Sequence, residues 1–234
     1  MNPIKIILVG DSTVGKTSII TQYIENRFEE EHLITMVGDK FPKDFKTKSG
    51  EIIKIEIWDT AGNEQYRAVN KIFMKNSKIV IFVYDITKEN TFNNLSFWYE
   101  QVINLNNKDE LIFAVAGNKS DLYEGQKVSV EEGENYAKKI NAIFTEISAM
   151  DHECIENMFD NIVNVYYDKI KKEKKEEKSN SGKIKKNVST ESSTNSDIKN
   201  SSKDGNFVLD PVKSSSKNNK NNEWCECLKK WLPF

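Results

Sequence analysis

The sequence contains little cysteine. Its three cysteines are Cys154, which stands alone, and Cys225 and Cys227, which lie close to the C-terminal end. This number and spacing exclude a disulfide framework and are typical of proteins in a reducing compartment. The small disulfide-rich secreted classes are therefore excluded, and we expect an intracellular protein.

The sequence also lacks a surplus of charge of one sign and a long apolar run. It has 34 Lys and Arg against 36 Asp and Glu, for a net charge of −2, so we expect no nucleic-acid partner. The N-terminal run Ile4–Val9 is short, contains Lys5 and leads at once into a glycine-rich loop. It fits a buried strand better than a secretory signal or a membrane span, and we expect a soluble protein.

The apolar residues are unevenly placed, and the sequence has no internal repeats. Apolar runs recur up to about Tyr167, and almost none follow. From about Lys172 the chain is rich in Lys, Asn, Ser and Glu, without sustained periodicity. We expect one domain at residues 1–172 and a flexible tail at 173–234 that is disordered as far as about Asn222.

Short β-rich runs alternate with helical stretches along the first 170 residues. The compact apolar segments are Ile4–Val9, Ile52–Trp58, Lys78–Asp85, Leu111–Gly117 and Ala142–Ile147. The candidate helices are Lys16–Glu25, Thr91–Asn106, Val130–Ile140 and Glu153–Ile170. This order predicts an α/β layered domain whose central strands are buried on both faces. Phe41–Ser49 and Glu51–Trp58, joined around Gly50, predict a hairpin that adds an antiparallel edge strand.

The segment Gly10–Thr17 reads GDSTVGKT and matches the pattern GxxxxGK[ST]. It follows an expected strand and opens an expected helix, which is the context of a phosphate-binding loop rather than of an ordinary glycine turn. Backbone N–H groups and the helix N-terminus would then face phosphate oxygens. Lys16 would neutralise the β and γ phosphates, and the Thr17 hydroxyl would ligate Mg²⁺. The expected phosphate-binding residues in this segment are Ser12, Thr13, Val14, Gly15, Lys16, Thr17 and Ser18.

A second segment distinguishes GTP from ATP. Asn118, Lys119 and Asp121 follow the strand Leu111–Gly117. The Asp121 carboxylate can accept hydrogen bonds from guanine N1–H and its 2-amino group, which adenine cannot provide. Such pairing discriminates by roughly 10⁴-fold or more. Asn118 would tie this loop to the phosphate loop, and the Lys119 stem would cover the base.

A third segment contributes to the same pocket. Ser148, Ala149 and Met150 follow the next strand, and the Ala149 N–H could bond guanine O6. Phe28, after the first helix, has two interpretations: it covers the other face of the base, or it is a core phenylalanine. His32 and His152 have no supporting neighbours in the sequence, so we expect neither to bind a metal.

The motifs GDSTVGKT, WDTAG (Trp58–Gly62), GNKSD (Gly117–Asp121) and EISA (Glu146–Ala149) stand in this order and resemble the small GTPases of the Ras superfamily. The resemblance covers residues 3 to about 170. It implies a P-loop NTPase G domain with a six-stranded, mostly parallel sheet flanked by helices. It also implies GTP or GDP and Mg²⁺ as cofactors and hydrolysis of GTP to GDP.

WDTAG, VYDIT (Val83–Thr87) and the pattern FxxLxxW (Phe92–Trp98) are similar to the Rab group in particular. This likeness implies a switch that recruits effectors in intracellular vesicle trafficking, on the cytosolic face of an intracellular membrane. The expected partners are an exchange factor, a GTPase-activating protein, effectors, and an escort protein or GDP dissociation inhibitor. The alternative is a GTP-loaded scaffold with negligible hydrolysis. NKSD argues against a third interpretation, a P-loop ATPase or kinase.

The resemblance assigns further residues to Mg²⁺ and to the γ-phosphate. Asp59 would hold Mg²⁺ through water, Gly62 would offer its N–H to the γ-phosphate, and Thr35 would supply a second Mg²⁺-binding hydroxyl. The stretch between Thr35 and Phe41 is one residue longer than in Rab proteins, so its register stays open. Asn63 stands where the family has the glutamine that orients the attacking water. Its shorter side chain predicts slow intrinsic hydrolysis, with Lys16, Thr35 and Asn63 as the catalytic residues.

Two groups of residues bear on contacts with effectors and with membranes. Phe41, Trp58 and Phe73 stand where Rab proteins display an apolar triad to effectors, although each could instead pack in the core. Cys225 and Cys227 form a CxC pair like those prenylated in Rab proteins, but seven residues follow it and no CaaX box is present. Prenylation, palmitoylation or interfacial contact of the apolar and basic end, and an unmodified tail all remain open.

Overall fold

The structure is a computed structural model that describes residues 2–29, 38–61 and 67–187. These residues belong to two compact units, one that runs through Lys171 and one that begins at Lys172. Among the described residues, no helix contains a hydrophobic stretch that could span a lipid bilayer.

Six strands form one sheet in the order β2-β3-β1-β4-β5-β6. All neighbouring pairs are parallel except β2 and β3, which are antiparallel. The strands are β1 (Ile4–Val9), β2 (Lys40–Lys46), β3 (Ile52–Trp58), β4 (Ile79–Asp85), β5 (Ile112–Asn118) and β6 (Ala142–Ile147). The predicted six-stranded, mostly parallel sheet with one antiparallel edge strand is confirmed.

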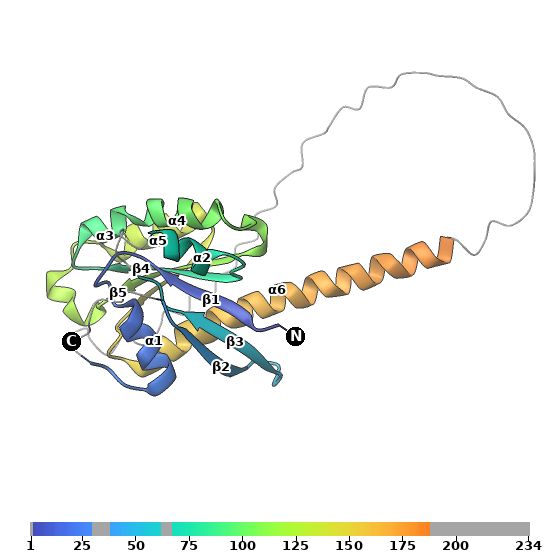
Figure 1. Cartoon of the computed structure of the whole chain (residues 1–234), viewed down its shortest axis with the longest axis horizontal. Helices are drawn as coiled ribbons and strands as arrows, with labels where there is room; N and C mark the ends of the chain where they lie inside the picture. Colours follow the sequence, from blue (N-terminus) through green and yellow to red (C-terminus); the bar gives the residue numbers. More distant parts are fainter. Residues whose placement is uncertain (1, 30–37, 62–66, 188–234) are drawn as a thin grey trace, which may run out of the picture. The chain divides into compact units, whose positions relative to one another are not determined.

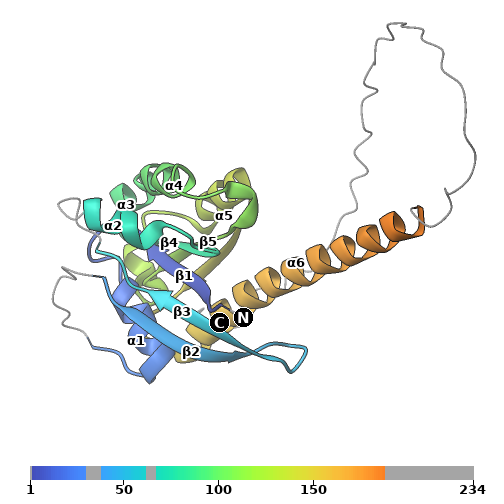
Figure 2. The same cartoon turned by 45° about the vertical axis from the view of Figure 1, so that its right-hand side comes forward.

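Helices cover both faces of the sheet (Figure 1). Helices α1 and α6 pack on one face, and α2, α4 and α5 pack on the other, as the turned view also shows (Figure 2). The helices are α1 (Lys16–Glu25), α2 (Arg67–Met74), α3 (Glu89–Asn93), α4 (Leu95–Ile103), α5 (Val130–Ile140) and α6 (His152–Asn187), with short 3₁₀ turns η2 (Lys108–Glu110) and η3 (Ser120–Gly125).

Strand β1 shows why the apolar runs are continuous. Ile6 and Leu8 belong to the core under α1 and α6, whereas Ile7 and Val9 belong to the core under α2, α4 and α5. Because side chains alternate between the faces of a strand, a strand covered on both faces needs apolar residues at every position. All of β4 is buried for the same reason.

The helices differ from the expectation in three respects. Helix α2 (Arg67–Met74) is not among the helices that the sequence predicts. The stretch expected as one helix over Thr91–Asn106 forms α3 and α4, separated at Asn94. At this break the Ser96 hydroxyl donates to the Asn93 carbonyl at 3.1 Å, and side chains that compete for backbone groups interrupt helices. Helix α6 continues to Asn187, well into the segment in which we expected the flexible tail, and residues 188–234 lie outside the described part.

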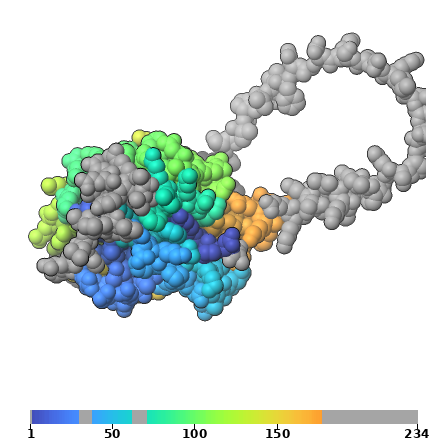
Figure 3. All heavy atoms as spheres, viewed as in Figure 1, coloured from blue at the N-terminus to red at the C-terminus, as the bar shows by residue number. Residues whose placement is uncertain are grey.

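The hairpin β2–β3 turns where the sequence predicts it. Gly50 has a φ of 83°, a conformation that glycine adopts without steric cost, and its N–H donates to the Thr47 carbonyl at 2.8 Å. The hairpin contacts α6 through Asn164, whose Oδ1 accepts from the Lys48 N–H at 2.9 Å. In the space-filling view the blue to cyan hairpin lies beside α6 residues that precede Lys172 (Figure 3).

Candidate functional site

The loop between β1 and α1 requires glycine at two positions. A Cβ on Gly10 would lie 2.1 Å from the Val83 carbonyl oxygen. At Gly15 the φ is 97°, and a Cβ would lie 2.3 Å from Asn118 Nδ2. The loop therefore packs directly against the ends of β4 and β5, which leaves no room for side chains at these two positions.

Lys16 begins α1 and buries its ammonium group under this loop. Its side chain is 5% exposed, and Nζ donates to the carbonyls of Gly10 at 2.9 Å and Asp11 at 2.8 Å. Burial lowers the pKa of Lys16 to about 8, while Asp59 and Asp11 act in the opposite direction. A buried cation with this electrostatic cost is suited to an anionic ligand such as phosphate.

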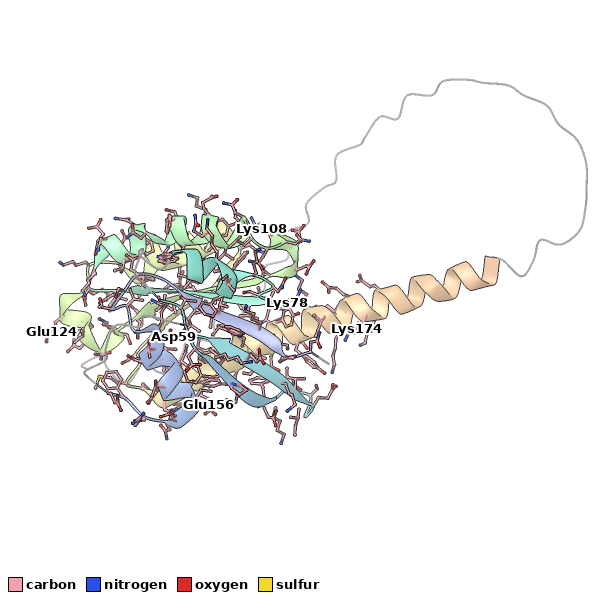
Figure 4. All side chains as sticks on the ribbon, viewed as in Figure 1. Asp59, Lys78, Lys108, Glu124, Glu156 and Lys174 are labelled. Carbon is pink, nitrogen blue, oxygen red and sulfur yellow. The ribbon has the colours of Figure 1, made fainter. Side chains whose placement is uncertain are left out.

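Thr17 and Asp59 bring two oxygen ligands together from α1 and from the residue after β3. Thr17 Oγ1 donates to Asp59 Oδ2 at 2.7 Å, and Asp59 is 2% exposed. Asp59 is labelled in Figure 4, close to the beginning of α1. Mg²⁺ prefers oxygen ligands such as hydroxyl and carboxylate groups, so Thr17 and Asp59 fit the expected ion.

Asn118, at the end of β5, connects three segments of the site. Its Nδ2 donates to the Val14 carbonyl at 2.8 Å, and its Oδ1 accepts from the Ala149 N–H at 3.0 Å. The side chain is 1% exposed. The prediction that Asn118 ties its loop to the phosphate loop is confirmed by this geometry. Because Asn118 already uses the Ala149 N–H, the expected bond from Ala149 to guanine O6 requires that N–H to be shared.

The expected base-selecting carboxylate has a fixed orientation. The Ser148 hydroxyl donates to Asp121 Oδ1, and the Met150 N–H donates to Ser148 Oγ at 3.2 Å. One oxygen of Asp121 is thus held by Ser148, and the side chain is only partly buried. Met150 itself is exposed, so only its backbone contributes to this arrangement.

Lys119 has a partner that sequence reasoning missed. Its backbone is left-handed, with a φ of 71°, and its Nζ lies 2.7 Å from Oδ2 of the buried Asp85. Burial alone raises the pKa of Asp85, but the bonds from Lys119 and Thr87 outweigh it and leave this pKa below its ordinary value. Asp85 is part of VYDIT, and nothing in that motif indicates by itself that it contacts Lys119.

The outer side of the phosphate loop carries further contacts that the sequence did not predict. Thr13 has a φ of 66°, which is unusual for a β-branched residue, and its hydroxyl lies 3.4 Å from Lys88 Nζ. Both carboxylate oxygens of Asp11 accept hydrogen bonds, one from Asn94 and one from Trp98.

The remaining expected site residues include one with a core contact, several outside the described residues, and two that lie where the sequence places them. Phe28 is half-buried and packs against the core under α1 and α6, which agrees with a core role and leaves its contact with a base as a prediction. Thr35, Gly62 and Asn63 lie outside the described residues, as do Cys225 and Cys227. Ser12 and Ser18 lie on the loop and in the first turn of α1 as expected.

The expected effector triad is divided between the two faces of the sheet. The Trp58 and Phe73 rings lie 5.5 Å apart between centroids, and a Cβ on Gly38 would touch the Phe73 ring. Phe41 pairs with Ile57 across the hairpin and packs on the α1 and α6 side. The structure thus brings Trp58 and Phe73 together and places Phe41 on the opposite face of the sheet.

A phosphate-binding loop between β1 and α1, together with NKSD at the end of β5 of a mostly parallel sheet, defines the G-domain class of P-loop nucleotide-binding proteins. The family model described as the Ras family matches residues 5–168. The chain is 36% identical over 160 residues to the Ras-related protein RabC of Dictyostelium discoideum, covering 68% of this chain and 81% of that relative.

The chain therefore belongs to the Ras family, and it is a Rab-like small GTPase. Proteins of this family bind GTP or GDP with Mg²⁺, hydrolyse GTP, and act as switches together with exchange factors, GTPase-activating proteins and effectors.

Proposed function

We propose that this protein is a Rab-type switch that binds Mg·GTP, hydrolyses it slowly and recruits effectors in intracellular vesicle trafficking. The observation that carries the proposal is the position of Asn118, whose side chain bonds both Val14 in the phosphate loop and Ala149 in the base loop. This one buried amide links the segment suited to phosphates with the segment suited to guanine.

In the proposed mechanism the chain's own residues position the nucleotide and stabilise charge. Lys16 and the loop N–H groups hold the β and γ phosphates as negative charge shifts during hydrolysis. Thr17 and Thr35 would hold the Mg²⁺ ion directly and Asp59 through water, and that ion supplies further charge neutralisation when bound. Gly62 would contact the γ-phosphate through its N–H.

Replacement of Asp121 tests whether the site selects guanine. In Asp121→Asn an amide that both donates and accepts replaces a carboxylate that only accepts, so the variant loses its pairing with the guanine 2-amino group. We expect GDP affinity to fall by roughly 100-fold or more, and affinity for xanthosine diphosphate, which has a carbonyl at that position, to rise. Fluorescence titration with each nucleotide measures both values.

Asp109→Asn is the control for this experiment, because Asp109 is an exposed carboxylate in η2, outside the proposed nucleotide site. An Asp121→Asn protein that binds GDP as tightly as the control would contradict the proposed guanine site. Equal binding of ADP and GDP by the parent protein would do the same.

Slow hydrolysis is proposed from Asn63, which is one methylene shorter than the family's glutamine. We expect Asn63→Gln to hydrolyse GTP about tenfold faster or more in single-turnover assays, because the longer amide reaches the attacking water. Asn63→Ala serves as the comparison and is expected to be no faster than the parent. If Asn63→Gln and the parent release phosphate at the same rate, Asn63 does not limit hydrolysis.

We further propose that the protein is cytoplasmic and acts at the cytosolic face of an intracellular membrane, with an escort protein or GDP dissociation inhibitor among its partners. The support is its Rab-like sequence and the CxC pair Cys225 and Cys227 near an apolar and basic end. Intact-mass analysis of protein from its native cell distinguishes prenylated, palmitoylated and unmodified tails, and a uniformly unmodified mass would contradict lipid anchoring.

A further inference from the structure

Asp11 places a carboxylate inside a loop suited to phosphates. It is the second residue of GDSTVGKT, and its backbone carbonyl accepts from Lys16 Nζ at 2.8 Å. A negative side chain so close to bound phosphates would repel them unless it is directed away and paired. The Asp11 carboxylate is therefore compatible with bound phosphates only if other groups hold it in another direction.

The structure provides partners for both oxygens of that carboxylate. Asn94 Nδ2 donates to Oδ2 at 2.7 Å, and Trp98 Nε1 donates to Oδ1 at 2.8 Å. Asn94 lies at the junction of α3 and α4, and Trp98 lies one turn further along α4. These two hydrogen bonds thus hold the beginning of α4 beside the phosphate loop.

The two donors differ in how firmly they are fixed. Trp98 is 4% exposed, and its indole packs in the core among residues such as Leu95 and Val102. Asn94 is exposed. A hydrogen bond from a buried, rigid indole to a charged acceptor is stronger and better oriented than one between two solvated groups. Trp98 therefore fixes the direction of the carboxylate, and Asn94 completes its pairing.

We propose that Asp11, Asn94 and Trp98 form a clamp that positions the phosphate loop against α4 and directs the Asp11 carboxylate away from the bound phosphates. Asp11 is a positioning residue in this arrangement and does not contact the nucleotide through its side chain. The proposal rests on the nucleotide site proposed above and adds to it a determinant of how long the nucleotide stays bound.

The clamp predicts faster nucleotide release when a donor is removed. In Trp98→Phe the ring stays in the core but the N–H is lost, and in Asn94→Ala the other donor is lost. We expect Trp98→Phe to release a fluorescent GDP analogue about tenfold faster than the parent, and Asn94→Ala, which loses the exposed donor, about threefold faster. Both are measured with full-length protein, Mg²⁺ and excess unlabelled GDP. Asn93→Ala, an exposed neighbour of Asn94, is the matched control and should stay within about twofold of the parent.

A charge-removing second substitution separates the clamp from simple core packing. If a freed Asp11 carboxylate repels the phosphates, Asp11→Asn introduced into Trp98→Phe should slow release again, by about threefold or more relative to Trp98→Phe alone. Raising the salt concentration should reduce the difference between these two proteins. If Trp98 only fills the core, Asp11→Asn cannot rescue the defect.

Unchanged release in both Trp98→Phe and Asn94→Ala would overturn the clamp. A double variant that releases nucleotide as fast as Trp98→Phe would overturn it as well. If Trp98→Phe fails to fold, the same comparison is made with Asn94→Ala, with and without Asp11→Asn. Failure of the nucleotide site itself is recognised separately, because the parent protein would then not retain the GDP analogue at all.

Discussion

Single residues in the site carry electrostatic costs that a ligand would relieve. Lys16 is buried and its pKa is lowered to about 8, so the folded protein without nucleotide gives up this proton more readily than the unfolded chain. Stability therefore rises with pH between about 8 and the ordinary lysine value, where the unfolded chain binds more protons than the folded one. Phosphate oxygens bound at Nζ favour the ammonium form and reverse the shift.

Proton uptake on GDP binding tests this account of Lys16. With the pKa of the free protein at about 8 and that of the complex well above it, binding takes up about half a proton at pH 8 and about a tenth at pH 7. Calorimetry in buffers of different ionisation enthalpy, with Mg²⁺ in excess, measures both numbers. Uptake that does not increase from pH 7 to pH 8 would show that Lys16 is fully protonated before GDP binds.

Several residues needed for the site were predictable from the sequence, and others were not. The glycines, Lys16 and Thr17 occur in a short motif whose spacing fixes its geometry. Asp85 and Asp11 gave no such signal, because their partners Lys119 and Trp98 are distant in sequence. For Ala149 the sequence indicated a bond from its N–H to guanine. It did not indicate that the Asn118 side chain accepts a hydrogen bond from the same N–H.

At the scale of elements, the hairpin β2–β3 is fastened to α6 by contacts of different kinds. Asn164 is buried, and its Oδ1 accepts from the Lys48 N–H while its Nδ2 donates to the Asp160 carbonyl at 2.7 Å. Lys171 Nζ lies 2.6 Å from Glu51 Oε1 in a largely exposed ion pair. We expect the buried Asn164 amide to contribute more to the free energy of unfolding than the ion pair does, because exposed ion pairs stabilise a fold only slightly.

Replacement of Asn164 tests that ranking. Asn164→Ala leaves the Lys48 N–H without its buried acceptor, so we expect the free energy of unfolding to fall by about 1–3 kcal/mol. Lys171→Ala, the comparison, should lower it by no more than about 1 kcal/mol. Urea unfolding with equal GDP and Mg²⁺ for all proteins measures both. Equal losses in the two variants would show that the amide is no more important than the surface ion pair.

Helix breaks and lengths show where element-scale prediction is limited. Most strand bounds follow from apolar runs, because strands covered on both faces must be apolar throughout. At the junction of α3 and α4 the Ser96 hydroxyl bonds the Asn93 carbonyl, a local contact that hydrophobic periodicity does not report. The extension of α6 runs through Lys- and Glu-rich sequence, where side-chain pairs at helical spacing can support a helix without a buried face.

At the scale of the whole molecule, the site brings together elements that are far apart in the sequence. Thr17 from α1 meets Asp59 from the end of β3, and Asn118 from β5 meets the phosphate loop. Close to Asp59, Phe73 packs over Gly38 and beside Trp58. The proposed Mg²⁺ site therefore lies next to the aromatic pair Trp58 and Phe73.

Removal of Mg²⁺ tests whether the ion joins these elements. Chelation by EDTA should speed GDP release by about tenfold or more, because Thr17 and Asp59 would then lack the cation that links them to the phosphates. The melting temperature of the GDP-loaded protein should fall at the same time, and restored Mg²⁺ should reverse both effects. Release that is indifferent to EDTA would contradict a metal site at Thr17 and Asp59.

The sequence by itself determined the layered α/β fold, the hairpin turn at Gly50 and the phosphate and base loops, because each depends on short-range spacing or on burial repeated along a strand. The tertiary structure decided which polar groups are paired. Asp11 and Trp98 are 87 positions apart, and Lys48 and Asn164 are 116 apart. Such contacts form only after the sheet and its covering helices are assembled, so no local pattern in the chain records them.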